Sequence, residues 1–186
     1  LIGGINQDIQ KMASATIENK ILKDQVNSLK KQSSESKKQI QEKTRMAEFS
    51  EDQLRVALKQ EIGQGLAEVQ REKDRVVVTV GSAGAFNSGS AKLTKKAREI
   101  MQKIAKVSAK GAGQVNVSGH TDDVPLIFGG QYRDNWDLAA ARASSVVQEL
   151  AKANTIPPDK LRAISFGETR PIEQNDTQQG REKNRR

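Results

Sequence analysis

Three short apolar runs that alternate with two helical patterns constrain the fold of this chain most strongly. The runs are Arg75–Val80, residues 114–119 and Leu161–Gly167, and their length and apolar character are typical of strands. Thr94 and residues 134–135 precede the helical patterns as candidate N-caps. The apolar stripes of those helices are Ala97, Ile100, Met101, Ile104 and Val107, and then Ala139, Ala143, Val146 and Leu150. This order predicts an α/β (α+β) sandwich of β-α-β-α-β type, with helices packed on one sheet.

Residues 1–50 are polar and contain no Pro, with Gly only at positions 3 and 4. Short stripes at helical spacing occur within them: Ile5, Ile9 and Met12, then Leu22, Val26 and Leu29. The Ser-rich residues 32–38 interrupt these stripes. We therefore expect residues 1–50 to form a polar linker that is helical or disordered. The alternative is a parallel coiled coil between two copies; the apolar positions hold no clean heptad repeat, which counts against a long one.

The apolar spacing becomes regular after residue 50. It predicts one face of an amphipathic helix over residues 51–69 that leads into the domain. The residues on this face are Leu54, Leu58, Ile62, Leu66 and Val69. Residues 70–186 then form the domain, and within it residues 81–90 and 168–183 are expected to be loops. In the first of these loops, Phe86 is expected to cover the core with its ring.

Composition limits the classes of partner. The chain has 186 residues, a net charge of +8 and no Cys, which excludes disulfides and thiolate metal sites. Residues 70–186 hold 20 basic and 13 acidic side chains, against 11 and 10 in residues 1–69. A basic domain suits an anionic polymer such as nucleic acid, acidic lipid or cell wall. No apolar run reaches the roughly 18 residues of a membrane span, and a start at Leu1 without a signal peptide suggests a fragment of a longer protein.

A candidate site combines a loop acid with a helix base. Asp122 follows the predicted strand 114–119, and Arg142 lies on the shoulder of the apolar stripe of the next helix. Asp accepts hydrogen bonds from an ammonium group, and Arg can bind a carboxylate through two parallel N–H donors, so the pair would select a zwitterionic ligand. Two alternatives remain open from the residues alone: Asp122 and Arg142 pair with each other, or Asp122 only caps a turn.

Enzymatic and nucleic-acid functions fit the sequence less well. His120 is the only His, and a catalytic metal site usually takes three protein ligands from separate elements. We therefore expect no catalytic residue, no metal and no cofactor. The Lys and Arg side chains of the helix after Thr94 alternate with its apolar stripe as on a solvated face, and the aromatic residues are scattered. Nucleic-acid modules usually interleave the two types for stacking, so nucleic acid is not an expected partner.

Several of these residues also carry a resemblance to a known family. In chain order they are Gly119-His120-Thr121-Asp122, Asn135, Leu138, Arg142-Ala143, Gly180-Arg181 and Asn184-Arg185-Arg186. This pattern resembles the peptidoglycan-binding domain of the OmpA-like family. Residues 122–125 (Asp-Asp-Val-Pro) and 135–138 (Asn-Trp-Asp-Leu) are most similar to the MotB/PomB flagellar stator subunits. The chain departs from the family at Ala139, where Ser is usual.

The resemblance implies a fold and a ligand. The fold would be that of the OmpA C-terminal domain, with a further strand after Arg186, so that the domain here is truncated at its C-terminus. The ligand would be the diaminopimelate of the peptidoglycan stem peptide. Asp122 would take its ammonium group and Arg142 its carboxylate. The resemblance places the other contacts at Thr121, Asn135 and Leu138 in the pocket and at Arg185 on its edge.

The resemblance also implies a role for the whole protein. Stator subunits act as homodimers in the inner membrane, with MotA/PomA-type membrane subunits, and their periplasmic domain anchors the ion-driven flagellar motor to the cell wall without catalysis. The alternative is an OmpA- or Pal-type envelope protein that tethers the outer membrane to peptidoglycan. A basic nucleic-acid-binding module is a less expected alternative than either of these anchors.

Overall fold

The computed structural model describes residues 2–87, 89–111, 113–126 and 130–186. It divides into two compact units, Leu1–Arg45 and Met46–Arg186. Helix α1 (Ile2–Ala57) makes up the first unit and begins the second. The Ser-rich residues 32–38 do not interrupt this helix; within it, the Ser34 hydroxyl donates to the carbonyl of Lys31 at 2.8 Å. In the described part of the chain, no helix combines the length and apolarity needed to cross a membrane.

The prediction of one helix over residues 51–69 is wrong at its C-terminal end. Helix α1 stops at Ala57, α2 covers Lys59–Gly63, and strand β1 covers Ala67–Glu72. Gly65 adopts a left-handed φ of 68°, which ends the helical path. The apolar spacing misleads here because Val69 is buried as a strand residue, in alternation with exposed neighbours, rather than as part of a helical stripe.

Strand β1 pairs with β2 (Arg75–Val80) in an antiparallel hairpin. The register sets Ala67 opposite Val80 and Val69 opposite Val78, so apolar side chains of both strands face the core. The turn uses Lys73 at a positive φ of 55°. The hairpin therefore supplies β2 as predicted, together with a strand that the sequence pattern did not reveal.

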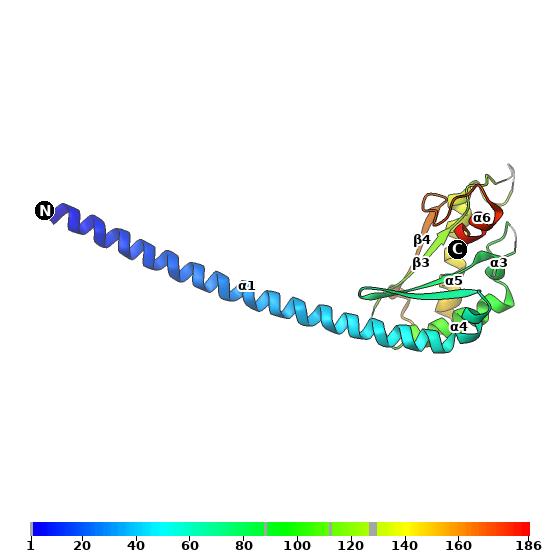
Figure 1. Cartoon of the computed structure of the whole chain (residues 1–186), viewed down its shortest axis with the longest axis horizontal. Coiled ribbons are helices and arrows are strands. Elements are labelled where there is room, and N and C mark those ends of the chain that lie inside the picture. The colour runs from blue at the N-terminus through cyan, green and yellow to red at the C-terminus, as the bar shows by residue number, and fades with distance from the viewer. Residues whose placement is uncertain (1, 88, 112, 127–129) are drawn as a thin grey trace. The chain divides into compact units, whose positions relative to one another are not determined.

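The remaining elements form a parallel βαβ unit and its surroundings. Strands β3 (Val115–His120) and β4 (Leu161–Gly167) pair in parallel, and α5 (Asn135–Lys152) connects and contacts them; Figure 1 shows this unit in yellow-green, yellow and orange. The 3₁₀ turn Pro158–Lys160 leads into β4. Two short helices lie in the expected loops: α3 (Ser82–Ala85) and α6 (Gln178–Asn184). Sequence analysis missed both because each is too short to show a periodic stripe.

The four strands form two separate pairs rather than the single sheet expected from the sequence. Backbone at the C-terminus lies between the two pairs. The amide of Ser82, just after β2, donates to the carbonyl of Arg185 at 2.9 Å. The amide of His120, at the end of β3, donates to the carbonyl of Arg186 at 2.9 Å. These two hydrogen bonds fix Arg185 and Arg186 beside the end of β3, where the candidate site begins.

Helix α4 (Lys95–Ser108) confirms the predicted stripe and cap. Its buried residues include all five predicted from the spacing, and Thr94 Oγ1 accepts from the amide of Ala97 at 3.1 Å. Its polar face is not simply solvated. Lys103 Nζ pairs with Glu61 Oε1 at 2.6 Å, and Lys96 donates to Gln64 at 2.8 Å. Part of the basic surface is therefore engaged in holding α2 against α4.

The close approach of α5 to β3 depends on Gly119. A Cβ atom at this position would lie 3.0 Å from the carbonyl carbon of Ala139 and closer still to its oxygen. Ala139 itself is fully buried. Because the end of β3 leads to Asp122 and α5 carries Arg142, this backbone contact sets the spacing between the two elements of the candidate site.

Candidate functional site

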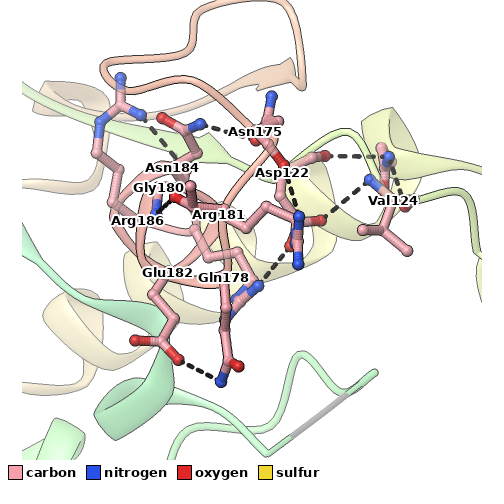
Figure 2. A network of polar contacts seen from close by, with 12 residues as sticks. Asp122, Val124, Asn175, Gln178, Gly180, Arg181, Glu182, Asn184 and Arg186 are labelled. Atoms are coloured by element: carbon pink, nitrogen blue, oxygen red, sulfur yellow. Dashed lines mark hydrogen bonds and ion pairs between the residues drawn. The ribbon is translucent and has the colours of Figure 1, made fainter.

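Asp122 lies two residues beyond β3, in a loop, with only 8% of its surface exposed. Its Oδ2 forms an ion pair with Arg185 Nη1 at 2.5 Å, and its Oδ1 accepts from the amide of Val124 at 3.3 Å. Figure 2 shows these contacts around the labelled Asp122. The carboxylate is therefore a buried anion whose partner comes from the C-terminal end of the chain and not from Arg142.

Arg142 lies on α5 and is also 8% exposed. Its Nε donates to the carbonyl of Ser90 at 3.0 Å, and its guanidinium stands 5.1 Å from the ring centre of Phe86. Burial lowers the pKa of Arg142 from its ordinary value, and the neighbouring Arg185 lowers it further, while Tyr132 and Asp122 oppose this effect. Arg remains protonated in proteins. In the described part of the chain, this buried cation has no carboxylate within ion-pair distance.

The other predicted site residues divide into two groups. Thr121 and Asn135 lie next to Asp122, the first in sequence and the second through a hydrogen bond. The Thr121 hydroxyl is buried and has no hydrogen-bond partner among the residues that the structure describes. The Asn135 side chain donates to the carbonyls of Asp122 at 3.3 Å and Val124 at 3.1 Å. Leu138 is 4% exposed on α5, so it offers little surface to a ligand in this structure.

Arg185 is placed by a buried polar network on α6. Asn184, which is fully buried, donates to the Asn175 side chain at 2.8 Å and to the carbonyl of Glu173 at 2.8 Å. Its Oδ1 accepts from the amide of Ile172 at 2.8 Å. Figure 2 shows Asn184 bonded to Asn175 within this network. Every polar atom of the Asn184 side chain is thus satisfied, which fixes the chain direction immediately before Arg185.

Asp122 and Arg142 are two buried charges of opposite sign that do not form an ion pair with each other. Asp122 and Arg142 affect one another electrostatically, yet Asp122 pairs with Arg185. Among the described residues, the polar head of Arg142 contacts a backbone carbonyl and an aromatic face. A carboxylate has four lone-pair positions and a guanidinium has five N–H donors, so both keep unused capacity. A ligand with an ammonium group and a carboxylate fits this capacity. No group of three or more His, Cys, Asp or Glu side chains that could hold a metal ion occurs among the described residues.

The predicted residues omit the side chains that orient Arg142 and Arg185. Phe86 packs against a small buried cluster, as expected, but it also lies under the Arg142 guanidinium. Ser90 acts through its backbone, and Asn184 lies one residue beyond the segment 168–183 that was expected to be a loop. The available signal for Asn184 was the motif Asn184-Arg185-Arg186, which is part of the family resemblance. Trp136, at the start of α5, is 45% exposed, and its ring lies against Gly167.

His120 stands next to the site at the end of β3. Its ring stacks on Phe166 with 5.1 Å between ring centres, and Arg170 covers the same Phe ring at 3.7 Å. Its Nδ1 is buried without a hydrogen-bond partner. Burial lowers the pKa of His120 to about 4, and repulsion from Arg186 and Arg170 adds to this effect. His120 is therefore neutral at pH 7 in the folded state.

This depressed pKa predicts a loss of stability in mild acid. An unfolded His takes up a proton near pH 6.5, whereas the folded protein does so only near pH 4. The contribution of His120 is therefore full above pH 6.5, falls between pH 6.5 and pH 4, and is constant below. After discounting for its partial exposure, we expect a decrease of about 1–2 kcal/mol in the free energy of unfolding across this window.

The measurement is urea unfolding of the wild type and of His120→Gln at a series of pH values. Carboxylates titrate in part of the same range, so the difference between the two proteins isolates the effect of His120. The free energy of unfolding of His120→Gln should lack the decrease that protonation of His120 causes between pH 6.5 and pH 4. Parallel curves for the two proteins between pH 4 and pH 6.5 would contradict the assignment.

Comparisons with known proteins agree with this fold. The family model described as the OmpA family matches residues 85–185, which is more than half of the chain. The protein YtxE of Bacillus subtilis is 32% identical over 117 residues, which cover 63% of this chain and 48% of YtxE. Motility protein B of the same organism is 28% identical over 120 residues, which cover 64% of this chain and 46% of the relative. The chain thus spans about half the length of these curated relatives.

Two solved structures extend the comparison. The cell wall anchor of the T6SS from Pseudomonas aeruginosa has a TM-score of 0.64 at 30% identity, covering 71% of this chain and 91% of that chain. The periplasmic domain of Helicobacter pylori MotB has a TM-score of 0.58 at 29% identity, covering 64% of this chain and 74% of that chain. The residues that the family model matches, 85–185, include β3, the Asp122 loop, α5 and α6. This chain belongs to the OmpA family, with MotB proteins among its relatives.

Proposed function

We propose that this protein binds peptidoglycan without catalysing a reaction, by holding the diaminopimelate of the stem peptide between Asp122 and Arg142. The observation that carries the proposal is the state of Arg142, a buried guanidinium that pairs with no carboxylate of the described residues. Leaving a charge buried and unpaired is costly, because it has lost water without gaining a counter-ion. A carboxylate from the ligand would offset that cost and use the N–H donors that Arg142 does not direct at Ser90.

The ammonium group of diaminopimelate is assigned to Asp122. Oδ2 of Asp122 is occupied by Arg185, but Oδ1 accepts only one long bond from Val124. An ammonium donor at Oδ1 would leave the ion pair with Arg185 intact. The unpaired hydroxyl of Thr121 supports a polar ligand at the same place. Arg185 then holds the acid in position, a closer role than the edge contact expected from the resemblance.

The direct test compares two kinds of isolated sacculi. Lysine in place of diaminopimelate keeps the side-chain amine but lacks the second carboxylate, so it removes the group assigned to Arg142. We expect binding to lysine-type sacculi to be weaker by at least about tenfold, or roughly 1.4 kcal/mol. Equal pelleting with both kinds would remove the assignment of diaminopimelate. Displacement by DNA with a steep dependence on salt would instead indicate a nucleic-acid-binding protein.

For the whole protein, the proposed role is anchoring of a flagellar stator to the cell wall. Similarity to motility protein B and to the periplasmic domain of MotB supports it. The domain would lie in the periplasm as part of a homodimeric inner-membrane protein that works with MotA/PomA-type membrane subunits. Anchoring is a mechanical requirement, because a motor unit that turns freely does no work on its rotor.

A second candidate is an envelope anchor that serves another assembly. The likeness to a cell wall anchor of the T6SS favours it, since that comparison covers 91% of the solved chain, and an OmpA- or Pal-type tether of the outer membrane belongs to the same class. The site and ligand are the same in both candidates. Deletion of the gene with a motility assay separates them: loss of swimming with normal flagellar filaments supports the stator, and normal swimming supports the other anchor.

A further inference from the structure

The first unit exposes large apolar side chains along a single helix. On α1, Met12 is 72% exposed, Leu22 50%, Val26 46% and Leu29 64%. Side chains of this kind on a helix of mostly polar sequence are buried by a partner when they lie on one face. The continuity of α1 from Ile2 to Ala57 allows their angular positions to be compared in one helical frame.

A short heptad repeat emerges in that frame. Met12, Asn19 and Val26 are spaced by seven residues and take position a, while Ala15, Leu22 and Leu29 take position d. The repeat weakens at Ser33 and Ser36, which occupy the next a and d positions. It therefore covers little more than two heptads, in agreement with the lack of a long repeat in the sequence. Ile17 and Ile21 fall at positions f and c, outside the seam.

Charges beside the seam distinguish between partners. Position e holds Lys23, Lys30 and Lys37, and position g holds Glu18, Gln25 and Gln32. In a parallel pair each g residue faces the e residue five positions later on the second copy, so Glu18 faces Lys23 and the two Gln residues face Lys. In an antiparallel pair, e faces e, and the Lys residues would repel one another. The charges therefore favour a second copy of this chain in parallel orientation.

Asn19 adds a constraint on the register. An amide at position a is satisfied in a two-stranded coiled coil when it faces the same amide of the second copy. A shift by one heptad would set Asn19 against Met12 or Val26 and bury its amide without a partner, which is unfavourable. The one polar residue of the seam thus selects a single alignment.

We propose that residues 12–29 of two copies form a parallel, in-register, two-stranded coiled coil in which Asn19 faces Asn19 of the second copy. This deepens the homodimer of the proposed function by assigning it a surface, an orientation and a register. It does not depend on the ligand of the Asp122 and Arg142 site. Because a repeat of this length is marginal by itself, the pairing is expected to depend on protein concentration.

Engineered disulfides give the first test, since the chain has no Cys of its own. Leu22→Cys sets the two thiols across the seam, and mild oxidation should link the copies. The matched control is Ile17→Cys, at position f, where the two Cα atoms would lie far beyond the 7 Å that a disulfide can bridge. We expect the first variant to cross-link at least about tenfold faster than the second. Equal rates, or no linkage of Leu22→Cys, overturn the proposal.

Mass and register are tested in the unmodified chain. Light scattering over a range of concentrations should approach twice the 20.4 kDa of one chain, and Leu22→Glu should keep the protein monomeric while leaving sacculus binding per monomer in place. Asn19→Val should raise the stability of the assembly and broaden its distribution of oligomers. A monomeric wild type overturns the dimer, and an Asn19→Val variant identical to wild type overturns the register. If the wild type does not bind sacculi, the proposed function is refuted, and the coiled coil is not.

Discussion

Arg142→Ala is expected to weaken binding to diaminopimelate-containing sacculi by about 2–5 kcal/mol, because the ligand carboxylate loses its counter-ion in a buried site. The large size follows from burial: at 8% exposure, water cannot replace the lost donors. The Arg142→Lys variant should bind sacculi with an affinity between those of the wild type and Arg142→Ala. It keeps the positive charge but loses the Nε bond to Ser90 and the planar pair of donors. A co-sedimentation titration with purified sacculi measures all three proteins.

The control for this prediction is Arg133→Ala. Arg133 precedes the same helix, and its side chain is 86% exposed, with a 3.4 Å ion pair to Asp137. Exposed pairs of this kind contribute about 0–1 kcal/mol, so the control should bind nearly as wild type. Circular dichroism establishes that each variant is folded. If Arg142→Ala and the wild type sediment equally with sacculi, Arg142 does not contact the ligand.

The parts of the fold that were predicted are those with a local signal. The stripe and cap of α4 follow from spacing and from Thr94, and β2, β3 and β4 follow from short apolar runs. The failures share one cause: spacing reports that a residue is buried, but it does not say by which element. Val69 continued a helical spacing by coincidence, and only its pairing with Val78 makes it a strand residue. The spacing of apolar residues alone does not reveal such cross-strand pairing.

In the candidate site too, the features with a local sequence signal were predicted and the others were not. Asp122 and Arg142 were predicted from charge type and position; the structure buries both, and their contact with a ligand stays a prediction. The partner of Asp122 was not found, because Arg185 lies 63 residues away in sequence and is brought there by the Asn184 network. The orientation of Arg142 was also hidden, since one of its contacts is the backbone of Ser90 and a carbonyl carries no residue type. The sequence therefore identified the charges but not what holds them.

Gly119→Ala is expected to lower the free energy of unfolding by about 3 kcal/mol and to weaken ligand binding by the protein that remains folded. The added Cβ would collide with the carbonyl of Ala139, which is backbone and cannot rotate away. Either the end of β3 or helix α5 must move. Because Asp122 follows β3 and Arg142 lies on α5, both responses change the distance between the two charges. Urea unfolding and sacculus co-sedimentation measure the two effects separately.

Gly113→Ala is the matched control, since a Cβ at this exposed loop position meets no atom within 4 Å. It should change stability by less than about 0.5 kcal/mol and leave binding unchanged. The comparison distinguishes close approach from a general effect of replacing Gly. If Gly119→Ala lowers stability but its folded fraction binds sacculi as tightly as wild type, the contact with Ala139 supports the fold without setting the geometry of the site. If it matches Gly113→Ala in both measurements, α5 does not lie as close to β3 as the structure places it.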